Sequence, residues 1–148
     1  MTLNKDLVWY CAGPMTGYAR FNYPMFRAAA EYMRGLGLTV ISPTELDSEL
    51  MQQVAWDSPD GDASTLTKAT GETWGDVLAR DVKVISDTLG GIVVLPDWFK
   101  SRGARLEVFV GLLTGKEFGA FYFNHANDPV LEVAPVGWIR KVMREHIP

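Results

Sequence analysis

Short apolar runs alternate along the chain with longer segments in which apolar residues recur every three or four positions. The short runs, each bounded by turn-forming residues, predict buried strands at 7–12, 38–41, 91–95 and 118–123. The periodic segments predict helices at 24–37, 44–54, 73–88, 103–114 and 137–146. Because strands that alternate with helices pair in parallel, we expect a three-layer α/β fold with a mainly parallel sheet. The length of 148 residues fits one domain covering 1–148.

Two segments of this pattern carry expectations of their own. The stretch 57–71 is polar and rich in turn-forming residues, so we expect a mobile loop of the kind that serves as a lid or binding segment. The helix at 103–114 has an apolar stripe, which is formed by Leu106, Phe109, Val110 and Leu113.

In folds of this class, ligands bind where the carboxyl ends of the parallel strands meet. Three predicted loops lie there, at 13–23, 42–43 and 96–103. The second is short, so the first and third are the candidates for a functional site. The first begins with GPMTG and lacks the glycine spacing of dinucleotide and triphosphate loops, although Gly13 would allow a ligand close to the backbone.

Asp81 is an anomaly of the helix at 73–88. Its neighbours one turn away are apolar: Val77, Leu78, Val84 and Ile85. A carboxylate is therefore expected inside the stripe that faces the sheet, where an unpaired charge costs free energy. An ion pair with Arg80, Arg102 or Arg105, or a cap on a neighbouring loop, would explain it structurally; a functional role is the alternative.

Glu107 is a second carboxylate in an unusual place, near the start of the helix that follows the loop at 96–103. Three of its neighbours one turn away are small: Gly103, Ala104 and Gly111. Small neighbours leave volume for a substrate, and a helix start favours an anion through its amide groups and dipole. A glutamate that only complements the helix dipole is the structural alternative. Tyr10, which closes the first strand, is either a core residue or a side chain that reaches the same crevice.

The start of the same helix also offers a site for a single phosphate. Ser101, Arg102 and the amide groups of Gly103 and Ala104 provide a hydroxyl, a charge and N–H donors. A solvent-exposed surface charge is the other explanation of Arg102.

Composition narrows the classes of partner. The net charge of −4 gives no general attraction to nucleic acid or anionic membranes. No apolar stretch approaches the ~20 residues of a membrane span, and residues 1–6 are too polar to begin a signal peptide. Cys11 lies in an apolar run and indicates a buried thiol in a reducing cytoplasm, while His125 and His146 lie far apart. We expect a soluble cytoplasmic protein that uses no metal or cofactor and binds no nucleic-acid polymer.

A set of motifs spread over roughly 8–123 resembles a known family. The motifs are YCAGPMTG at 10–17, FNYP at 21–24 with Phe26, Gly37, VISP at 40–43, Asp81, LPDW at 95–98, SRGA at 101–104 and Glu107. In this order, and at strand ends, they resemble the nucleoside 2-deoxyribosyltransferase superfamily. The closest similarity is to its small phage and bacterial branch, known as DUF4406 domains.

The resemblance implies a flavodoxin-like (Rossmann-like) sheet and a homo-oligomer whose neighbouring subunits complete each site. It also implies a glutamate that attacks the anomeric carbon of a nucleoside and forms a glycosyl-enzyme intermediate, as in retaining glycosidases. Glu107 matches this nucleophile through its spacing from Gly103. Asp81 matches the aspartate that handles the proton of the departing base, and Tyr10 matches the tyrosine that positions the nucleophile. Glu107 is then expected to be ionised, while the apolar surroundings of Asp81 favour its protonated form.

One departure from the family bears on the substrate. Six residues before the nucleophile, members that act on free nucleosides tend to carry an aspartate, where this chain has Ser101. A serine there is similar to the nucleoside 5′-monophosphate N-glycosidase branch, so we expect a nucleotide monophosphate, and hydrolysis in preference to transfer. The predicted substrate-binding residues are Gly13, Met15, Asn22, Asp97, Trp98, Ser101, Arg102, Gly103 and Ala104.

Three other functions stay open. A non-catalytic nucleotide-binding protein would keep the phosphate site at 101–104 but would not need both Asp81 and Glu107. An enzyme that cleaves another ribosyl bond, such as that of NAD, could also use a glutamate, with the segment 57–71 admitting the larger substrate. An interaction domain could use the five tryptophans as contact surface.

Overall fold

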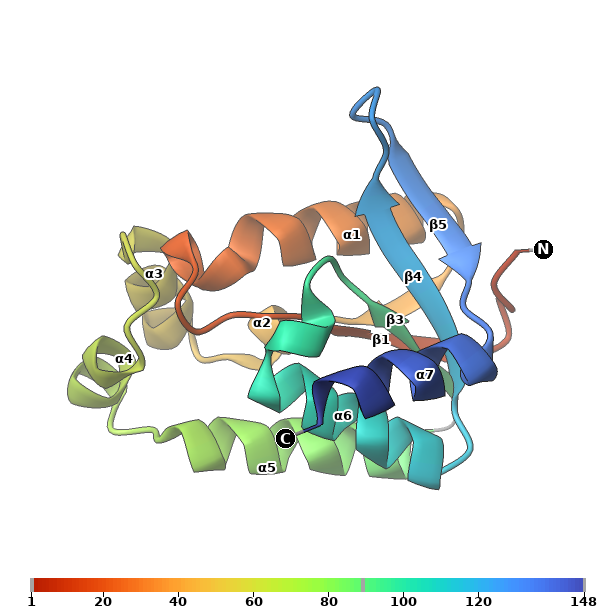
Figure 1. Ribbon diagram of the computed structural model, residues 1–148. Helices are drawn as coiled ribbons and strands as arrows, with labels where there is room; N and C mark the ends of the chain where they lie inside the picture. Colours follow the sequence, from red (N-terminus) through yellow and green to blue (C-terminus); the bar gives the residue numbers. More distant parts are fainter. Residues whose placement is uncertain (1, 89, 148) are drawn as a thin grey trace.

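The computed structural model describes residues 2–88 and 90–147 and contains a five-stranded sheet flanked by helices (Figure 1). The strands lie in the order β2-β1-β3-β4-β5. Their bounds are Val8–Ala12 for β1, Thr39–Ile41 for β2, Gly90–Val94 for β3, Glu117–Phe123 for β4 and Pro129–Val133 for β5. The first four strands run parallel, and β5 pairs antiparallel with β4. The predicted three-layer α/β, Rossmann-like fold with a mainly parallel sheet is therefore confirmed.

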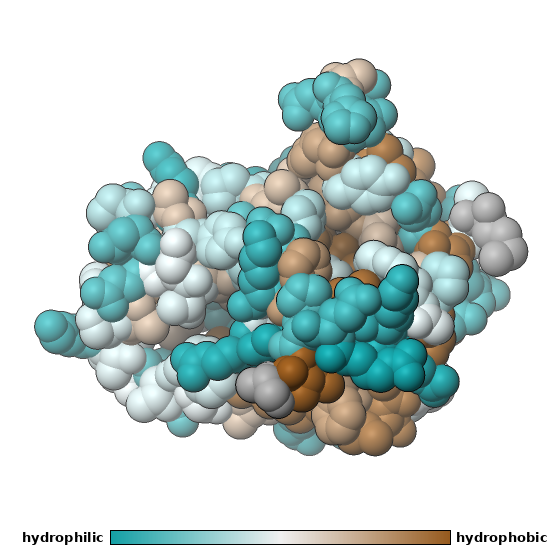
Figure 2. All heavy atoms as spheres, in the orientation of Figure 1, coloured by the Kyte–Doolittle hydropathy of each residue, from teal (hydrophilic) through white to brown (hydrophobic). Residues whose placement is uncertain are grey.

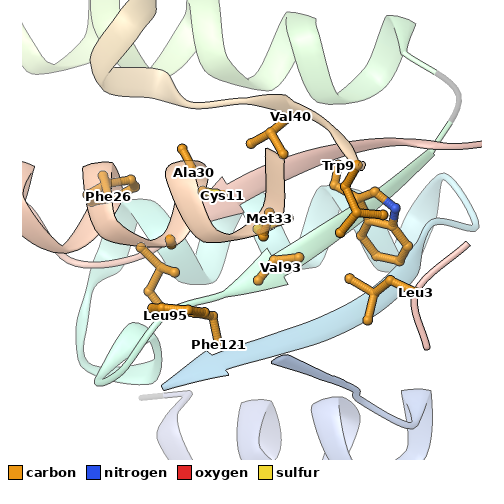
Figure 3. Packing of buried hydrophobic residues seen from close by; sticks show 12 residues of the cluster. Leu3, Trp9, Cys11, Phe26, Ala30, Met33, Val40, Val93, Leu95 and Phe121 are labelled. Carbon is orange, nitrogen blue, oxygen red and sulfur yellow. The ribbon is translucent and has the colours of Figure 1, made fainter. Parts of the chain in front are cut away.

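Alternate residues of each strand divide the core between the two faces of the sheet. Trp9 and Cys11 of β1 point toward α1 (Tyr23–Gly35), whereas Tyr10 and Ala12 point toward the opposite layer. That layer consists of α5 (Trp74–Asp87), α6 (Arg102–Leu113) and α7 (Val136–His146). Figure 3 shows the α1 face, where helix and strand residues pack together: Phe26, Ala30, Met33, Val93, Leu95 and Phe121. Cys11 is fully buried there, as predicted.

The strand β5 occupies part of the segment after β4 that the sequence predicts to be a polar loop. Each of its five residues stays at least partly exposed, and the strand begins with Pro129. Proline is tolerated at the first position of an edge strand, where its missing N–H costs no ladder hydrogen bond. Because an edge strand needs no continuous apolar run, the sequence pattern does not distinguish it from a loop.

The helix predicted at 44–54 is divided into α2 (Pro43–Leu46) and α3 (Glu49–Asp57). The backbone is extended at Asp47 and Ser48 between them, and the Ser48 hydroxyl accepts a hydrogen bond from the backbone N–H of Met51. Ser48 therefore caps the start of α3. The break turns Asp47 inward, and only 6% of this residue is exposed.

The segment 57–71 contains a further helix, α4 (Ala63–Thr70), so the prediction of a loop without secondary structure is wrong. The Asp62 side chain caps the start of α4, and Gly71 ends it in the left-handed conformation. None of residues 63–70 is fully buried, which explains why no apolar period marks the helix. The helices α3 and α4 lie together at one end of the molecule, at the left of Figure 1.

Gly61 attaches this segment to the loop after β1. Its carbonyl oxygen accepts a hydrogen bond from the backbone N–H of Gly17 at 2.9 Å. A Cβ at position 61 would lie 2.3 Å from the carbonyl oxygen of Tyr18, and the φ of 68° is one that glycine adopts readily. Next to this contact, Phe21 of the short helix η1 (Ala19–Asn22) packs against Ala55 of α3.

Most of the predicted apolar stripe of α6 faces solvent, and only its Val110 packs partly buried against the core. Leu106, Phe109 and Leu113 are 39%, 46% and 71% exposed. Apolar surface also gathers at the lower right of Figure 2, where α6 ends in Figure 1. The face toward the core carries Ala104, Glu107, Val108 and Gly111. A Cβ on Gly111 would lie 2.4 Å from Cδ1 of Ile92, so this glycine permits close packing of helix on sheet. The expectation that Gly111 leaves open volume beside Glu107 is therefore wrong.

Candidate active site

A pocket opens at the carboxyl ends of β1 and β3, where the strand order of the sheet reverses. Open α/β sheets bind their ligands at this position. The walls come from the loop after β1, from α3 and α4, from the first half of α5 and from the first turns of α6. They enclose about 760 Å³, counting the part that is open to solvent. Seven residues predicted for the site line it: Gly13, Met15, Asp81, Ser101, Gly103, Ala104 and Glu107.

Tyr10 and Glu107 meet beneath this pocket. The Tyr10 hydroxyl donates a hydrogen bond to Oε2 of Glu107, and the two residues are 4% and 6% exposed. The alternation of β1 turns Tyr10 toward α6, and the period of α6 turns Glu107 inward beside Ala104 and Val108. The structure thus brings together the two residues that the resemblance pairs as nucleophile and positioning tyrosine; the roles themselves stay predictions.

Burial raises the pKa of two acids in the pocket, Glu107 and Asp81. The pKa of Glu107 rises to about 8, mainly through loss of water and further through the Asp81 carboxylate, while the hydrogen bond from Tyr10 opposes the rise. Burial also raises the pKa of Asp81 to about 6, against the attraction of Arg80. Near neutral pH the pair therefore holds one proton, and the protein's own groups place it on Glu107. This order is the reverse of the one expected from the sequence, because Asp81 has a direct arginine partner, Arg80, which Glu107 lacks.

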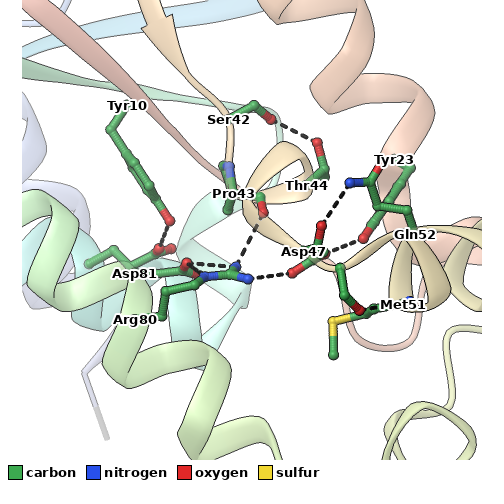
Figure 4. Close-up of polar contacts among 12 residues, drawn as sticks. Tyr10, Tyr23, Ser42, Pro43, Thr44, Asp47, Met51, Gln52, Arg80 and Asp81 are labelled. Atoms are coloured by element: carbon green, nitrogen blue, oxygen red, sulfur yellow. Dashed lines mark hydrogen bonds and ion pairs between the residues drawn. The ribbon is translucent and has the colours of Figure 1, made fainter. Parts of the chain in front are cut away.

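Asp81 belongs to an ion-pair network in the pocket wall (Figure 4). Nε and Nη2 of Arg80 lie 2.9 Å and 2.8 Å from Oδ1 of Asp81. Nη1 of the same guanidinium lies 2.7 Å from Oδ1 of Asp47, and the Tyr23 hydroxyl donates to Oδ2 of Asp47. Of the three arginines considered as partners of Asp81, the structure selects Arg80.

The first turn of α6 presents part of the predicted phosphate site to the pocket. Ser101 is the N-cap residue, and its hydroxyl oxygen accepts a hydrogen bond from the N–H of Ala104 at 3.2 Å. A Cβ added to Gly103 would meet no atom closer than 3.9 Å, so open space reaches the backbone there. Arg102 is exposed and lies outside the lining, with its guanidinium carbon 5.5 Å from the centre of the Trp74 ring. Phosphate binding by Arg102 therefore stays a prediction.

Three other residues predicted for substrate binding lie outside the lining: Asn22, Asp97 and Trp98. Nδ2 of Asn22 donates to the carbonyl oxygen of Pro14 at 2.9 Å and stabilises the loop after β1. Asp97 pairs with Lys100 at 3.3 Å, and Trp98 is 3% exposed in the core. The structure gives each of the three a structural contact, and substrate binding by them stays a prediction.

Sequence reasoning missed the contribution of the α2–α3 junction and of α4. The junction and the α3 helix after it add Asp47 and Met51 to the lining, and α4 adds Leu66 and Thr67. Tyr23, the first residue of α1, lines the pocket beside them. The single helix predicted at 44–54 does not show that the chain breaks at Asp47 and turns this side chain inward. The adjacent Asp47 and Ser48 are residues of the helix-capping type, and this signal could have revealed the break.

The described residues, 2–88 and 90–147, contain neither a candidate metal site nor a candidate membrane-spanning helix. No group of three or more His, Cys, Asp or Glu side chains there is arranged to hold a metal ion. No helix in this part combines the length and the apolar character needed to cross a membrane.

Fold and pocket define an α/β protein of Rossmann-like architecture with a buried pair of acids at the point where its strand order reverses. Residues 7–59 match the family model described as "Domain of unknown function (DUF4406)". The match runs from β1 to the end of α3; it includes Tyr10 and Asp47 and ends before Asp81 and Glu107. No curated protein and no solved structure matches the chain. The predicted similarity to DUF4406 domains is confirmed for this part of the chain, and the wider link to nucleoside 2-deoxyribosyltransferases stays a prediction.

Proposed function

We propose that this protein cleaves the bond between base and sugar in a nucleoside or its 5′-monophosphate, with Glu107 as the nucleophile. The observation that carries the proposal is the buried carboxyl group of Glu107, which accepts a hydrogen bond from Tyr10 and lies near Asp81 in a pocket at the carboxyl edge of the sheet. Enzymes that cleave a glycosidic bond typically use such a pair of acids, one to attack the sugar and one to carry a proton.

The chemistry proceeds in two steps. A carboxylate oxygen of Glu107 attacks the anomeric carbon, the bond from this carbon to the base nitrogen breaks, and Asp81 protonates the departing base. Water or a second base then attacks the anomeric carbon and releases Glu107, while Asp81 takes up the proton of the attacking group. Tyr10 holds the Glu107 carboxylate in place throughout.

The protonation state of the acid pair is compatible with these steps because it supplies one proton. The reaction requires that proton on Asp81 instead of Glu107. The two placements are tautomers of the same singly protonated pair. Positive charge develops on the sugar in the transition state and favours ionised Glu107. The hydrogen bond from Tyr10 acts in the same direction, since it lowers the pKa of Glu107.

The lining supports recognition of a nucleobase more directly than recognition of a phosphate. Apolar and aromatic side chains, among them Phe21, Met51 and Trp74, offer surfaces to a planar ring. Of the residues that the structure describes, no lysine or arginine lines the pocket, whereas four acids do: Asp47, Glu72, Asp81 and Glu107. A 5′-phosphate would therefore bind at the first turn of α6, on its free amide groups and the Ser101 hydroxyl.

Release of free base tests the proposal, measured by liquid chromatography over a panel of nucleosides, 5′-monophosphates and NAD. We expect release from a nucleoside or 5′-monophosphate, reduced at least ~1,000-fold in Glu107→Ala and Glu107→Gln. Glu31→Ala is the matched control, because this glutamate is exposed on α1. A covalent intermediate would add the mass of the sugar to acid-quenched protein, on the peptide that contains Glu107.

Each other outcome favours a different function. Tight binding of a nucleotide without release of base favours the non-catalytic binding protein. Release of nicotinamide from NAD alone favours a hydrolase of that ribosyl bond. Release that survives Glu107→Ala excludes Glu107 as the nucleophile.

Gly103→Ala separates the two substrate forms. The added methyl group meets no protein atom closer than 3.9 Å, so the fold tolerates it while it occupies space that a phosphate on α6 would need. We expect kcat/KM for the 5′-monophosphate to fall ~10-fold and that for the nucleoside to change little. Gly35→Ala, at a position on α1 that is also open, is the control. Equal losses for both substrates would place the phosphate elsewhere.

The homo-oligomer with shared sites that the resemblance implies is part of the same proposal. Sedimentation equilibrium is expected to give a multiple of the chain mass. If neighbouring subunits share each site, inactive Glu107→Ala subunits should regain some activity when mixed with an inactive variant whose substitution lies in the part of the site that the neighbouring subunit supplies. A monomer with full activity would contradict shared sites.

A further inference from the structure

Arg80 binds a single oxygen of Asp81. Its Nε and Nη2 atoms both lie within 2.9 Å of Oδ1. Asp81 lines the pocket with 5% of the residue exposed. A carboxyl group that is fixed through one oxygen presents the other in a defined direction, as proton transfer to a bound substrate requires.

Asp47 fixes the guanidinium in turn. Nη1 of Arg80 lies 2.7 Å from Oδ1 of Asp47, and Nη2 donates to the carbonyl oxygen of Pro43 at 3.2 Å. Asp47 is held by the Tyr23 hydroxyl, and its carbonyl oxygen accepts a hydrogen bond from the Gln52 side chain at 2.8 Å. Contacts from α1, α2 and α3 therefore reach Asp81 through this one arginine.

Stability alone is a poor explanation of the network. A buried ion pair often stabilises a fold no more than apolar residues of the same volume, because desolvation offsets the attraction. Two carboxyl side chains that are only 3% and 7% exposed share one arginine here, so they repel each other across it. Groups that perturb one another in this way, beside a pocket, are typical of functional sites.

We infer that Asp47 and Arg80 are positioning residues for Asp81: Arg80 orients the acid and favours its ionised form, and Asp47 limits this effect by partly neutralising Arg80. The role of Asp81 in catalysis rests on the function proposed above, but the electrostatic effect on Asp81 needs no substrate.

The sign of each effect follows from the groups that face Asp81. They come from every element packed around it: Tyr10 of β1, Tyr23 of α1, Asp47 before α3, Arg80 of α5 and Glu107 of α6. Loss of the positive charge of Arg80 raises the pKa of Asp81. Loss of the negative charge of Asp47 lowers it.

Carbon-13 NMR titration of labelled aspartate and glutamate side chains tests the inference without a substrate. Asp47→Asn is expected to lower the pKa of Asp81 and Arg80→Gln to raise it, each by roughly one pH unit. Asp87→Asn and Lys83→Gln are matched controls, because they remove the same charges from an exposed pair on α5. Changes of the same sign in both test variants, or no larger than in the controls, would overturn the inference.

If Arg80→Gln does not fold, Arg80→Lys still tests the inference. The lysine variant retains the positive charge but lacks the planar fork of N–H groups. We expect its Asp81 pKa to stay near that of the wild type while kcat falls ~10-fold and KM changes less than ~2-fold. An unchanged kcat would contradict the positioning role. If no substrate of the panel is turned over, the proposed function fails, and the NMR titration still decides the electrostatic part.

Discussion

At the scale of residues, the chemistry of the pocket depends on the pKa of Glu107. Burial and the Asp81 carboxylate, which is distant in sequence, both raise this pKa. Gly13 is constrained by packing as well as by the pocket. It lines the pocket, yet a Cβ there would lie 2.9 Å from Cβ of Leu95, so packing alone already requires glycine.

The acid pair predicts a bell-shaped pH dependence of kcat/KM for the proposed reaction. With a pKa of about 8 for Glu107 and about 6 for Asp81, the pair holds one proton between these values. At lower pH the nucleophile is protonated, and at higher pH the acid is lost. In Asp81→Asn the pKa of Glu107 should fall, because the neighbouring negative charge is gone. A rate that rises steadily through both values would contradict a shared proton.

Glu107 also predicts that stability depends on pH. Its pKa is raised by folding, so the stability it contributes is fully present below its ordinary value of 4.5 and is lost as the pH rises through about 8. Glu107→Gln cannot ionise, and we expect it to be more stable than the wild type by a few kcal/mol above that pH. Denaturant unfolding at acidic and alkaline pH measures the difference. Equal stability of the two proteins at alkaline pH would show that Glu107 ionises without cost.

At the scale of elements, the apolar pattern predicts buried elements and fails for exposed ones. The strands β1 and β3 and the helices α1, α5 and α7 follow their predicted ranges closely, because each buries a set of apolar residues at the right period. The helix α4 and the strand β5 have no fully buried residue, so only their caps and turns could have marked them. Asp47 and its contact with Arg80 depend on the break before α3 and on a pairing of distant segments, which periodicity does not encode.

Substitutions on the two faces of α6 should differ in their effect on the free energy of unfolding. Gly111→Ala would place a Cβ 2.4 Å from Cδ1 of Ile92, and we expect a loss of about 1–3 kcal/mol in the free energy of unfolding. Leu113→Ser, at a residue that is 71% exposed, should change it by less than about 0.5 kcal/mol. Denaturant titration of both variants measures these effects. A large loss for Leu113→Ser would mean that this face is covered in solution.

At the scale of the whole molecule, the pocket depends on how α3 and α4 are attached to the rest of the chain. They supply Met51, Leu66 and Thr67 to its wall, but α4 buries none of its residues. Segments with few buried contacts are the first to open, so we expect the attachment at Gly61 to affect the shape of the pocket.

Gly61→Ala tests this dependence. The added Cβ would lie 2.3 Å from the carbonyl oxygen of Tyr18, so the segment must move away from the loop after β1. We expect faster hydrogen exchange in 58–71 and KM raised ~10-fold, with little change around α7. Gly71→Ala is the comparison, because it has a similar φ of 77° but open space around it. Unchanged exchange in 58–71 would show that other contacts hold the segment.

The contact between Asp47 and Arg80 joins the part of the chain that matches the DUF4406 model to the part beyond it. Loss of Arg80 leaves Asp47 and Asp81 as buried carboxylates without their shared cation, and breaking a buried ion pair in this way typically costs about 3–5 kcal/mol. A lineage that loses one of these residues is therefore under selection to replace the other. Positions 47 and 80 should therefore vary together among related proteins. A relative with apolar residues at both positions should orient the carboxyl group at position 81 through other contacts.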